Sequence, residues 1–556
     1  MKNLVFLSLL LIFNRIDTFS QIDLNSISGL KDKPFTNSSV WQETYGGSGF
    51  EYATCIVNTF DGGFAVTGVT NSYGFGNYDV CLLKLDHTGT LQWVKVLGGA
   101  KEDIGNCIIQ TSDSGYAIAG STLSYVTSYY EDMYIIKLNS AGELLWARTI
   151  GRGGSDIAST IKEMSDGSLI AAGYTVINSP LEYGLTIVKL DNNGTVVWSR
   201  MAKKLGNGLL DPSVIQTMDG GYGIASSIDS VMGAGDICFL KLDNAGNLQW
   251  SWVIGGSNEE DSYSVCQTRD SGFAFAGFTN TFGAGYPDLY VVKVSKSARL
   301  EWTRTIGGDN DDYGFSILNN ADGSFTVGGE SFSYSLGSMD MYIINLDQRG
   351  NYKWGRTTGG PDLEFIRSIV PASDGGYVAV GSTYSFGAGE RDMFIVKTDS
   401  AGNTCANTTM PVPHIDSGGT LLKYTVQMYN ISPTIMSVGP NISGWGEIST
   451  LCLTEMNPFT GIIPLSFSLH QNYPNPFNPI TKIQFDIPSK GQRLAFDTKL
   501  IIYDISGREI TTLINEQLQP GSYSVDWDGT GYASGVYFYS LITNEFTETK
   551  RMVLVK

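Results

Sequence analysis

The stretch Asp86-HTGTLQ-Trp93 decides the fold, because its tryptophan marks a unit that recurs along most of the chain. The equivalent tryptophans follow one another at spacings of 52, 53, 52, 52, 52 and 52 residues: Trp41, Trp93, Trp146, Trp198, Trp250, Trp302 and Trp354. Cys405 stands 51 residues after the last of them, at the next expected place. Periods of this length are typical of solenoids, propellers or arrays.

Each unit carries the same turn signals. A glycine pair and an acid follow the tryptophan, and then come a short apolar strand, a tight turn such as Asp61-Gly-Gly, a second strand, a longer loop and a third strand. A D-x-x-G turn leads into the next tryptophan strand. Four short strands per unit, with turn chemistry at each junction and no convincing helical period, predict the blades of a β-propeller.

Seven tryptophan strands and seven tight turns predict an all-β, seven-bladed propeller over residues 41–405. The strand at Trp41 has no preceding strands of its own, so we expect it to complete the last blade beside strands near 366–371, 376–382 and 392–398. An open solenoid is the alternative, but it would leave its end sheets exposed. One tryptophan per blade is interpreted as packing between blades.

Two sets of acids recur with the unit. The first lies ten residues before the turn aspartate in six units: Glu51, Asp103, Asp156, Glu260, Asp312 and Glu364. The second opens the third strand in six units: Asp79, Asp132, Asp236, Asp288, Asp340 and Asp392. Gly184 replaces the second acid in the third unit, and in the fourth unit Asp211 is shifted by two positions. Propeller topology predicts both sets on one face of the ring.

Two interpretations of these carboxylates are open. In the favoured one, each carboxylate accepts hydrogen bonds from backbone N–H groups of glycine-rich loops. In the other, some of them bind a hard cation such as calcium. No strict EF-hand spacing appears, so calcium is a weak hypothesis, and we otherwise expect no cofactor and no metal site.

Signals for catalysis are few, and the sequence favours a non-enzymatic role. No two of the three histidines stand at metal-ligand spacing. No G-x-S-x-G elbow or P-loop stands between a strand and a helix. We therefore assign no catalytic residue from the sequence.

The composition excludes several classes of partner. The formal net charge is −19, from 36 basic and 55 acidic residues, which disfavours nucleic acid and anionic membranes. Aromatic residues make up 12% of the chain, enough for a large core, so general disorder is excluded. Charged residues are only 16% and glycines number 66, which excludes a coiled coil.

The seven cysteines fall into two groups. Five lie inside expected propeller strands and are interpreted as small buried core residues. Cys405 and Cys452 flank the segment 406–462, which has no repeat and is interpreted as a connector with some strand. In an exported protein these two cysteines could form a disulfide.

The N-terminus predicts export. Residues 1–20 have a basic start followed by an apolar run, the pattern of a secretory signal peptide, and residues 21–40 form a short polar segment before the propeller. No later run reaches about 18 apolar residues, so we do not expect an integral membrane protein.

A second domain is expected over residues 463–556. Six or seven alternating strands across some 90 residues predict an antiparallel sandwich of immunoglobulin-like type. Three segments stand out: Asn472-YPNPFNP, Asp504-ISGREI, and Gly535-VYFY with the closing Lys550-RMVLVK.

These segments resemble the C-terminal sorting domain of the type IX secretion system, found in Bacteroidetes and related Gram-negative bacteria. The resemblance covers about one sixth of the chain. It implies export to the periplasm, recognition by the type IX machinery, and release from the cell or attachment to its surface. The residues that carry it are Asn472, Pro474, Asn475, Pro476, Asn478, Gly535, Tyr537 and Lys550.

We therefore expect a secreted or surface-attached propeller that binds a protein or glycan. The contact would be made by loops on one face, including residues 73–78, 282–287 and 386–391. The alternative is a secreted hydrolase acting on polysaccharide, with paired carboxylates at the channel mouth as acid and base.

Overall fold

The computed structural model contains only strands, turns and loops in the residues that it describes. These are residues 40–126, 129–178, 181–203, 212–228, 234–405, 408–409, 411, 413–423, 427–430, 434–438, 441–443, 447–453, 467–472, 475–488, 496–518 and 521–555. The expected signal peptide over 1–20, the N-terminal segment up to residue 39, Asp211 and Pro474 lie outside these ranges. The chain divides into two compact units, Met1–Leu451 and Cys452–Lys556, which are described separately.

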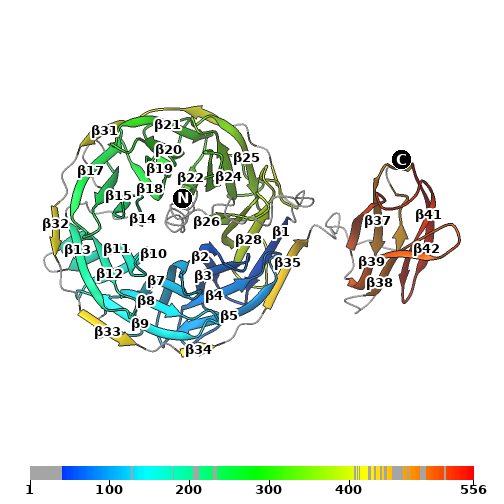
Figure 1. Cartoon of the computed structure of the whole chain (residues 1–556), viewed down its shortest axis with the longest axis horizontal. Helices are drawn as coiled ribbons and strands as arrows, with labels where there is room; N and C mark the ends of the chain where they lie inside the picture. The colour runs from blue at the N-terminus through cyan, green and yellow to red at the C-terminus, as the bar shows by residue number, and fades with distance from the viewer. Residues whose placement is uncertain are drawn as a thin grey trace, which may run out of the picture. The chain divides into compact units, whose positions relative to one another are not determined.

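The first unit is a ring of seven antiparallel sheets, a seven-bladed β-propeller (Figure 1). Four strands of each blade are ordered from the axis of the ring outward. Blades 1 to 3 contain β2 (Glu51–Asn58), β3 (Phe64–Thr70), β4 (Asp79–Leu85), β5 (Leu91–Gly98); β6 (Asp103–Gln110), β7 (Tyr116–Thr122), β8 (Asp132–Leu138), β9 (Leu144–Gly151); and β10 (Ser155–Glu163), β11 (Leu169–Asn178), β12 (Leu181–Leu190), β13 (Val196–Lys203).

Blades 4 to 6 follow the same plan. Their strands are β14 (Ser213–Gln216), β15 (Tyr222–Ile228), β16 (Asp236–Leu242), β17 (Leu248–Gly255); β18 (Glu260–Gln267), β19 (Phe273–Thr279), β20 (Asp288–Val294), β21 (Leu300–Gly307); and β22 (Asp312–Asn319), β23 (Phe325–Ser331), β24 (Asp340–Leu346), β25 (Tyr352–Thr358).

Blade 7 closes the ring with strands from both ends of the repeat. It consists of β26 (Glu364–Pro371), β27 (Tyr377–Thr383), β28 (Asp392–Thr398) and β1 (Trp41–Gly46). β1 pairs with β28 in antiparallel register, with Trp41 opposite Lys397 and Tyr45 opposite Met393. The expected closure by the Trp41 strand is confirmed.

Local chemistry explains the short strands. The Asp61 carboxylate accepts the N–H of Gly63 at 3.0 Å and forms an ion pair with Lys84 at 2.8 Å, so the tight turn is fixed from both sides. Gly62 has a φ of 86°, a conformation that favours glycine. Middle strands such as β3 are buried along their whole length, because neighbouring blades cover both faces of each sheet.

The repeated tryptophans lie against the next blade. A Cβ added to the D-x-x-G glycine of that blade would come within 2.9 Å of the indole, as at Gly89 over Trp41 and Gly142 over Trp93. Four of the indoles also carry a guanidinium at 5.2 to 5.9 Å from the ring centroid. Six of the seven rings therefore fill a space that a glycine turn leaves open, and the equivalent turn position opposite Trp250 is Ala298, with a φ of 55°.

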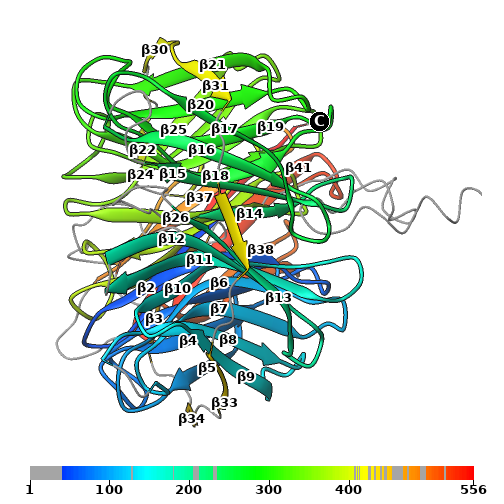
Figure 2. The same cartoon turned by 90° about the vertical axis from the view of Figure 1, so that its left-hand side faces the viewer.

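The segment after the repeat is a belt around the ring. We use this name for strands β29 (Thr408–Thr409), β30 (His414–Asp416), β31 (Thr420–Lys423), β32 (Gln427–Asn430), β33 (Thr434–Val438), β34 (Asn441–Ser443) and β35 (Glu447–Leu453). They add a fifth strand to blades 6, 5, 4, 3, 2, 1 and 7 in that order, against the chain order of the blades. The belt strands lie on the outside of the blades in both views (Figures 1 and 2).

The belt explains how the propeller protects its outer edges. An unpaired edge strand presents free N–H and C=O groups that template aggregation. Each belt strand is antiparallel to the outer strand of its blade wherever the register is resolved, as for Ile415 opposite Ile306 and Ile442 opposite Leu97. The composition of residues 406–462 suggested a connector and did not predict this role.

The second unit is a β-sandwich of two antiparallel sheets. One sheet contains β36 (Ser468–Leu469), β37 (Ile480–Ile487) and β40 (Gly521–Asp528). The other contains β39 (Glu509–Leu518), β38 (Phe496–Tyr503), β41 (Gly535–Thr543) and β42 (Thr547–Leu554). Side chains of both sheets, among them Phe485, Trp527, Leu500 and Tyr539, share one buried core.

Candidate functional site

The first set of acids lies at the start of the innermost strands and is fully buried, at 0 or 1% exposure. Each of the six carboxylates accepts the backbone N–H four residues before it, at 2.5 to 2.9 Å. A threonine hydroxyl of the second strand donates to five of them, as from Thr70 to Glu51 at 2.9 Å and from Thr383 to Glu364 at 2.6 Å. These contacts support the interpretation that the acids fix loops.

The second set of acids lies beside the first, across each blade junction. In the Asp288/Asp312 junction, Gly307 separates the two carboxylates: a Cβ added to this glycine would overlap Asp288 Oδ1 and come within 2.8 Å of Asp312 Oδ2. The acid of the third strand of one blade thus pairs with the acid of the first strand of the next. The six pairs are Asp79/Asp103, Asp132/Asp156, Asp236/Glu260, Asp288/Asp312, Asp340/Glu364 and Asp392/Glu51.

At one junction the sequence differs at all three positions of this arrangement. Between blades 3 and 4, Gly184 stands in place of the third-strand acid, Lys203 in place of the first glycine, and Leu209 in place of the first-strand acid. Gly184 pairs directly with Lys203 in the register of β12 and β13. In the paired junctions a glycine is needed because the third-strand aspartate occupies the space of its Cβ. Where that aspartate is replaced by Gly184, the glycine and the second acid are replaced as well. We call this the unpaired junction and the other six the paired junctions.

Burial sets the protonation of the paired acids. It raises the pKa of Asp312 and of Asp340 to about 7, with Asp288 and Glu364 as the neighbouring like charges. Burial also raises the pKa of Asp132 and of Asp288 to about 6. Raised pKa values of this size favour the protonated form of Asp312 and Asp340 up to about neutral pH. Because the pairs are buried and bonded to loop N–H groups, they offer no obvious acid and base to a bound polysaccharide.

The calcium hypothesis gains little from this geometry. Calcium takes six to eight oxygen ligands, whereas each junction brings together two carboxylates whose oxygens accept N–H groups or press on a glycine. In the described ranges no group of three or more His, Cys, Asp or Glu side chains is placed to hold a metal ion.

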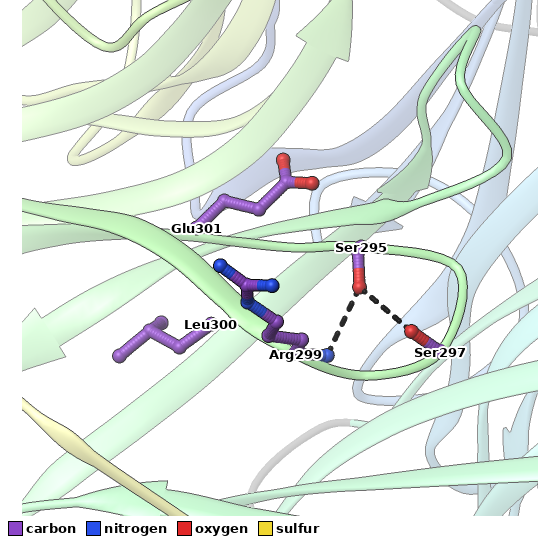
Figure 3. A pocket seen from close by; sticks show the side chains of 5 residues that line it. All are labelled: Ser295, Ser297, Arg299, Leu300 and Glu301. Atoms are coloured by element: carbon purple, nitrogen blue, oxygen red, sulfur yellow. Dashed lines mark hydrogen bonds between the residues drawn. The ribbon is translucent and has the colours of Figure 1, made fainter.

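A shallow hollow on the outer turn between β20 and β21 is also a weak candidate (Figure 3). Its volume is about 480 Å³, and Ser295, Ser297, Arg299, Leu300 and Glu301 line it. Its polar groups largely satisfy one another or their own turn: Arg299 N donates to Ser295 Oγ at 3.1 Å, and Glu301 forms an ion pair with Lys293 at 2.9 Å.

A cluster without counterpart in the other units lies on the innermost strands of blades 5, 6, 7 and 1, together with Glu330 of β23 and with Tyr384 and Arg391 of the loop between β27 and β28. We call it the aromatic–arginine cluster, and it consists of Tyr52, Tyr263, Tyr313, Phe315, Glu330, Phe365, Arg367, Tyr384 and Arg391. Neighbouring rings are in contact, as for Tyr263 and Phe315 at 4.7 Å between centroids. On β6 and β10 the corresponding positions hold Ile104, Asn106, Ile157 and Ser159. The aromatic residues are therefore confined to one side of the propeller channel.

Arg367 is one of the two cations of the cluster. Its guanidinium lies 4.5 Å from the Phe315 centroid and 5.5 Å from that of Phe365, and its Nη1 forms an ion pair with Glu330 at 2.5 Å. Glu330 also accepts the N–H of Ile366 at 3.1 Å. Burial raises the pKa of Glu330 to about 7 in spite of Arg367. Glu330 is thus buried, whereas the side chain of Arg367 is 35% exposed.

Arg391 is the second cation, and in the described residues no acidic side chain lies within ion-pair distance of it; Glu330 acts on it only from farther away. Its guanidinium lies 4.6 Å from the Phe365 centroid, 5.0 Å from that of Tyr52 and 5.5 Å from that of Tyr384. Nε donates to Ser382 Oγ at 2.8 Å, and within the described part of the chain neither terminal nitrogen has a hydrogen-bond partner. Three rings therefore hold a guanidinium whose outer N–H groups are available.

The sequence analysis did not identify this cluster, because it considered residues that recur in every unit and the residues of the cluster do not recur. Alignment of the units at their turn aspartates would have found it. Where Arg367 stands, the other units have Thr54, Asn106, Ser159, Pro212, Tyr263 and Phe315; where Glu330 stands, they have Val69, Ser121, Tyr174, Ser227, Phe278 and Ser382. No other unit has a basic residue in place of Arg391. Departures from a structural repeat are where a function can be added to it.

The expected contact loops are partly exposed. Phe75 of the loop 73–78 is 45% exposed, and Tyr286 of the loop 282–287 is 66% exposed. The loop 386–391 ends at Arg391 and so contributes to the aromatic–arginine cluster. Of the three loops, it is the one that the structure places in the cluster.

The cysteines differ in state. Cys55, Cys81, Cys107, Cys238 and Cys266 are free, with Cys55 Sγ and Cys107 Sγ 3.6 Å apart on neighbouring inner strands. Cys405 is disulfide-bonded. The side chain of Cys452 lies outside the described residues; as the one remaining cysteine, it is our proposed partner for Cys405.

The candidate sorting residues hold the start of the sandwich to its last strands. The N–H of Asn472 donates to Tyr539 Oη at 2.8 Å, and Asn475 Oδ1 accepts the N–H of Val553 at 2.9 Å. Both Asn475–Pro476 and Asn478–Pro479 are cis peptides. Tyr537 Oη donates to Ala533 O at 2.7 Å, and Lys550 forms an ion pair with Glu548 at 3.1 Å.

Part of the chain is similar in sequence to a bacterial regulatory protein. The regulatory protein FlaEY of Caulobacter vibrioides is 29% identical over 177 residues, which are 27% of this chain and 18% of that protein. The chain thus spans less than a fifth of that relative. In the described ranges no helix is long and apolar enough to cross a membrane.

Two solved structures are similar at low scores. PorZ, a surface component of the type IX secretion system of Porphyromonas gingivalis, has 10% identity and a TM-score of 0.20, with 91% of this chain and 81% of that chain covered. An endo-1,5-α-L-arabinanase from Thermotoga petrophila RKU-1 has 11% identity and a TM-score of 0.24, with 64% and 99% covered. At such scores neither carries an argument.

The sandwich gives the clearest match. Residues 471–556 match the family model of the secretion system C-terminal sorting domain. This range contains the three segments that carry the resemblance to sorting domains of the type IX secretion system. The chain is therefore an exported protein that carries a type IX sorting domain and reaches the cell surface or the extracellular space.

Proposed function

We propose that the exported propeller is a glycan-binding module and that the aromatic–arginine cluster is its contact surface. The cluster itself is the observation that carries this proposal. Half-buried aromatic rings present flat apolar faces, and sugar rings stack on such faces while their hydroxyls bond to nearby polar groups. A rigid ring of blades holds these side chains in place without a cost in ordering them.

Hydrolysis of a polysaccharide is the weaker alternative. It needs two carboxyl groups about 5 to 10 Å apart on either side of the scissile bond. The repeated acids are at most 1% exposed in the first set and are bonded to loops. Glu330 has the raised pKa that a general acid needs, but it is 4% exposed and paired with Arg367.

A glycan array with the full chain tests the proposal, together with a reducing-end assay on the same glycans. We expect saturable binding of at least one glycan class without release of reducing ends. Tyr384 is 39% exposed, so Tyr384→Ala should weaken that binding several-fold. Binding that survives both Tyr384→Ala and Tyr52→Ala would place the contact elsewhere, and turnover would favour the hydrolase.

A further inference from the structure

We infer that the glycan bound at the cluster is acidic, and that Arg391 holds its carboxylate or sulfate group. This inference rests on the proposed function and narrows it to one ligand class. It starts from the contrast between the two arginines. Arg367 lies 2.5 Å from the Glu330 carboxyl, whereas Arg391 has no ion-pair partner in the part of the chain that the structure describes.

The donor geometry of Arg391 suits an anion. A guanidinium presents its N–H donors as a planar fork that matches the two oxygens of a carboxylate. In Arg391 only Nε is engaged, by Ser382 Oγ. The rings of Tyr52, Phe365 and Tyr384 lie within 5.5 Å of the guanidinium and take up none of its N–H donors as hydrogen-bond acceptors.

The backbone fixes where this fork lies. Arg391 O accepts the N–H of Glu51 at 2.7 Å, and Phe50 and Arg391 form an isolated parallel bridge. Glu51 is in turn one of the buried acids of a paired junction. The repeated scaffold therefore positions an unrepeated cation, which reduces the entropy lost on binding.

The net charge of the propeller and the burial of Arg391 indicate that this arginine has a function in binding. By sequence count, residues 41–405 carry about −17 of the net −19 of the chain. Burial and the nearby Arg367 lower the pKa of Arg391, so the position costs free energy. Two guanidinium groups and a single carboxyl, that of Glu330, give the cluster a net positive charge inside an acidic domain. An anionic ligand would remove that cost.

The rings define the rest of the ligand. Beside Arg391, the exposed face of Tyr384 and the half-buried rings of Tyr52 and Phe365 favour a flat, ring-shaped group next to the anion. A uronic acid or a sulfated sugar has both features in one residue. Both ligands are acidic sugars, one with a carboxylate and the other with a sulfate. The experiment below distinguishes these two groups.

The test measures binding of the full chain to four polymers: polygalacturonate, its methyl ester, dextran sulfate and dextran. The methyl ester is the matched neutral control, because esterification removes only the charge. We expect polygalacturonate or dextran sulfate to bind at least tenfold more tightly than its neutral counterpart, and the stronger of the two identifies carboxylate or sulfate.

Variants connect the selectivity to Arg391. Arg391→Gln should abolish the preference, so that the charged polymer and its neutral counterpart bind with equal affinity. Arg391→Lys keeps the charge but loses the fork, and should retain only part of the preference. Arg299→Gln, an exposed arginine of the outer turn shown in Figure 3, is the control and should have no effect. Melting temperatures check that every variant folds.

The outcomes separate the two proposals. Binding of neutral and charged polymers with equal affinity overturns the acidic-ligand inference and leaves the glycan-binding proposal standing. Charge selectivity that persists in folded Arg391→Gln also overturns the inference. The absence of binding to any of these polymers and to the array overturns both.

Discussion

The six paired junctions and the unpaired junction belong to the same repeat, and the comparison concerns three of the positions at which they differ. A paired junction has an aspartate, a glycine and a second acid, as in Asp288, Gly307 and Asp312. The unpaired junction has Gly184, Lys203 and Leu209. The comparison teaches that the acids and the glycine belong to one structural device, since all three positions change together in the sequence. Their regular recurrence reflects the needs of the fold.

Filling the glycine space should have the largest effect. In Gly307→Val the new side chain would overlap Asp288 Oδ1, so we expect the free energy of unfolding to fall by about 3 kcal/mol. Adding Asp288→Gly, which copies the unpaired junction, should restore part of it. Urea unfolding measures both. Lys203→Val at the unpaired junction is the control and should change stability by less than about 0.5 kcal/mol.

Removing a first-set acid should cost somewhat less. Asp103 accepts Gly99 N at 2.7 Å and Ser124 Oγ at 2.6 Å, and it also accepts the Thr122 hydroxyl. Asp103→Ala leaves these donors unpaired, so we expect a loss of about 2 kcal/mol in urea unfolding. Unchanged stability would contradict a loop-fixing role. Leu209→Ala is the matched change at the unpaired junction and removes no such acceptor.

The paired junctions should also make the stability of the protein depend on pH. The pKa of Asp340 and Asp312 is raised to about 7 in the folded protein, so the protonated carboxyl favours folding. This contribution is present at low pH and is lost as the pH rises toward and through 7. We therefore expect a higher melting temperature at pH 5.5 than at pH 8. Asp340→Asn, which is neutral at every pH, should flatten the profile; an unchanged profile would contradict the assignment.

The turn ion pairs should show the smallest effect and no difference between junctions. Lys84 pairs with Asp61 at 2.8 Å, and Lys189 pairs with Asp166 at 3.0 Å in the blade that borders the unpaired junction. Both aspartates are more than half exposed, so Asp61→Asn and Asp166→Asn should each cost less than about 1 kcal/mol. Thermal unfolding with a clear difference between them would show that the junction acts on the turn.

The sequence predicts the parts of this molecule that are local or repeated. Turn chemistry such as Asp86 with Gly89 and the spacing of the tryptophans predict seven four-stranded blades and their closure. The belt could not be predicted in this way, because strands such as Thr408–Thr409 and Asn441–Ser443 are too short for a hydrophobic period and pair with edges far away in the sequence.

The candidate site was missed for a different reason. The acids attracted attention because they recur, but recurrence marks what every blade needs to fold. Arg367, Arg391 and Glu330 each occur once, and only the closed ring brings blade 7 beside blade 1, so that Arg391 meets Tyr52. A comparison between units would point to these positions, whereas their contact depends on tertiary structure.

The belt also fixes how many blades this protein can have. It supplies one strand to each of seven blades, from β29 on blade 6 to β35 on blade 7. Propellers built from equal repeats can gain or lose a unit by duplication or deletion of about 52 residues. Here an added blade would find no belt strand, and a deleted one would leave a belt strand without an edge. Two separate stretches of the gene must therefore change together, which makes blade number a trait that single recombination events do not easily alter.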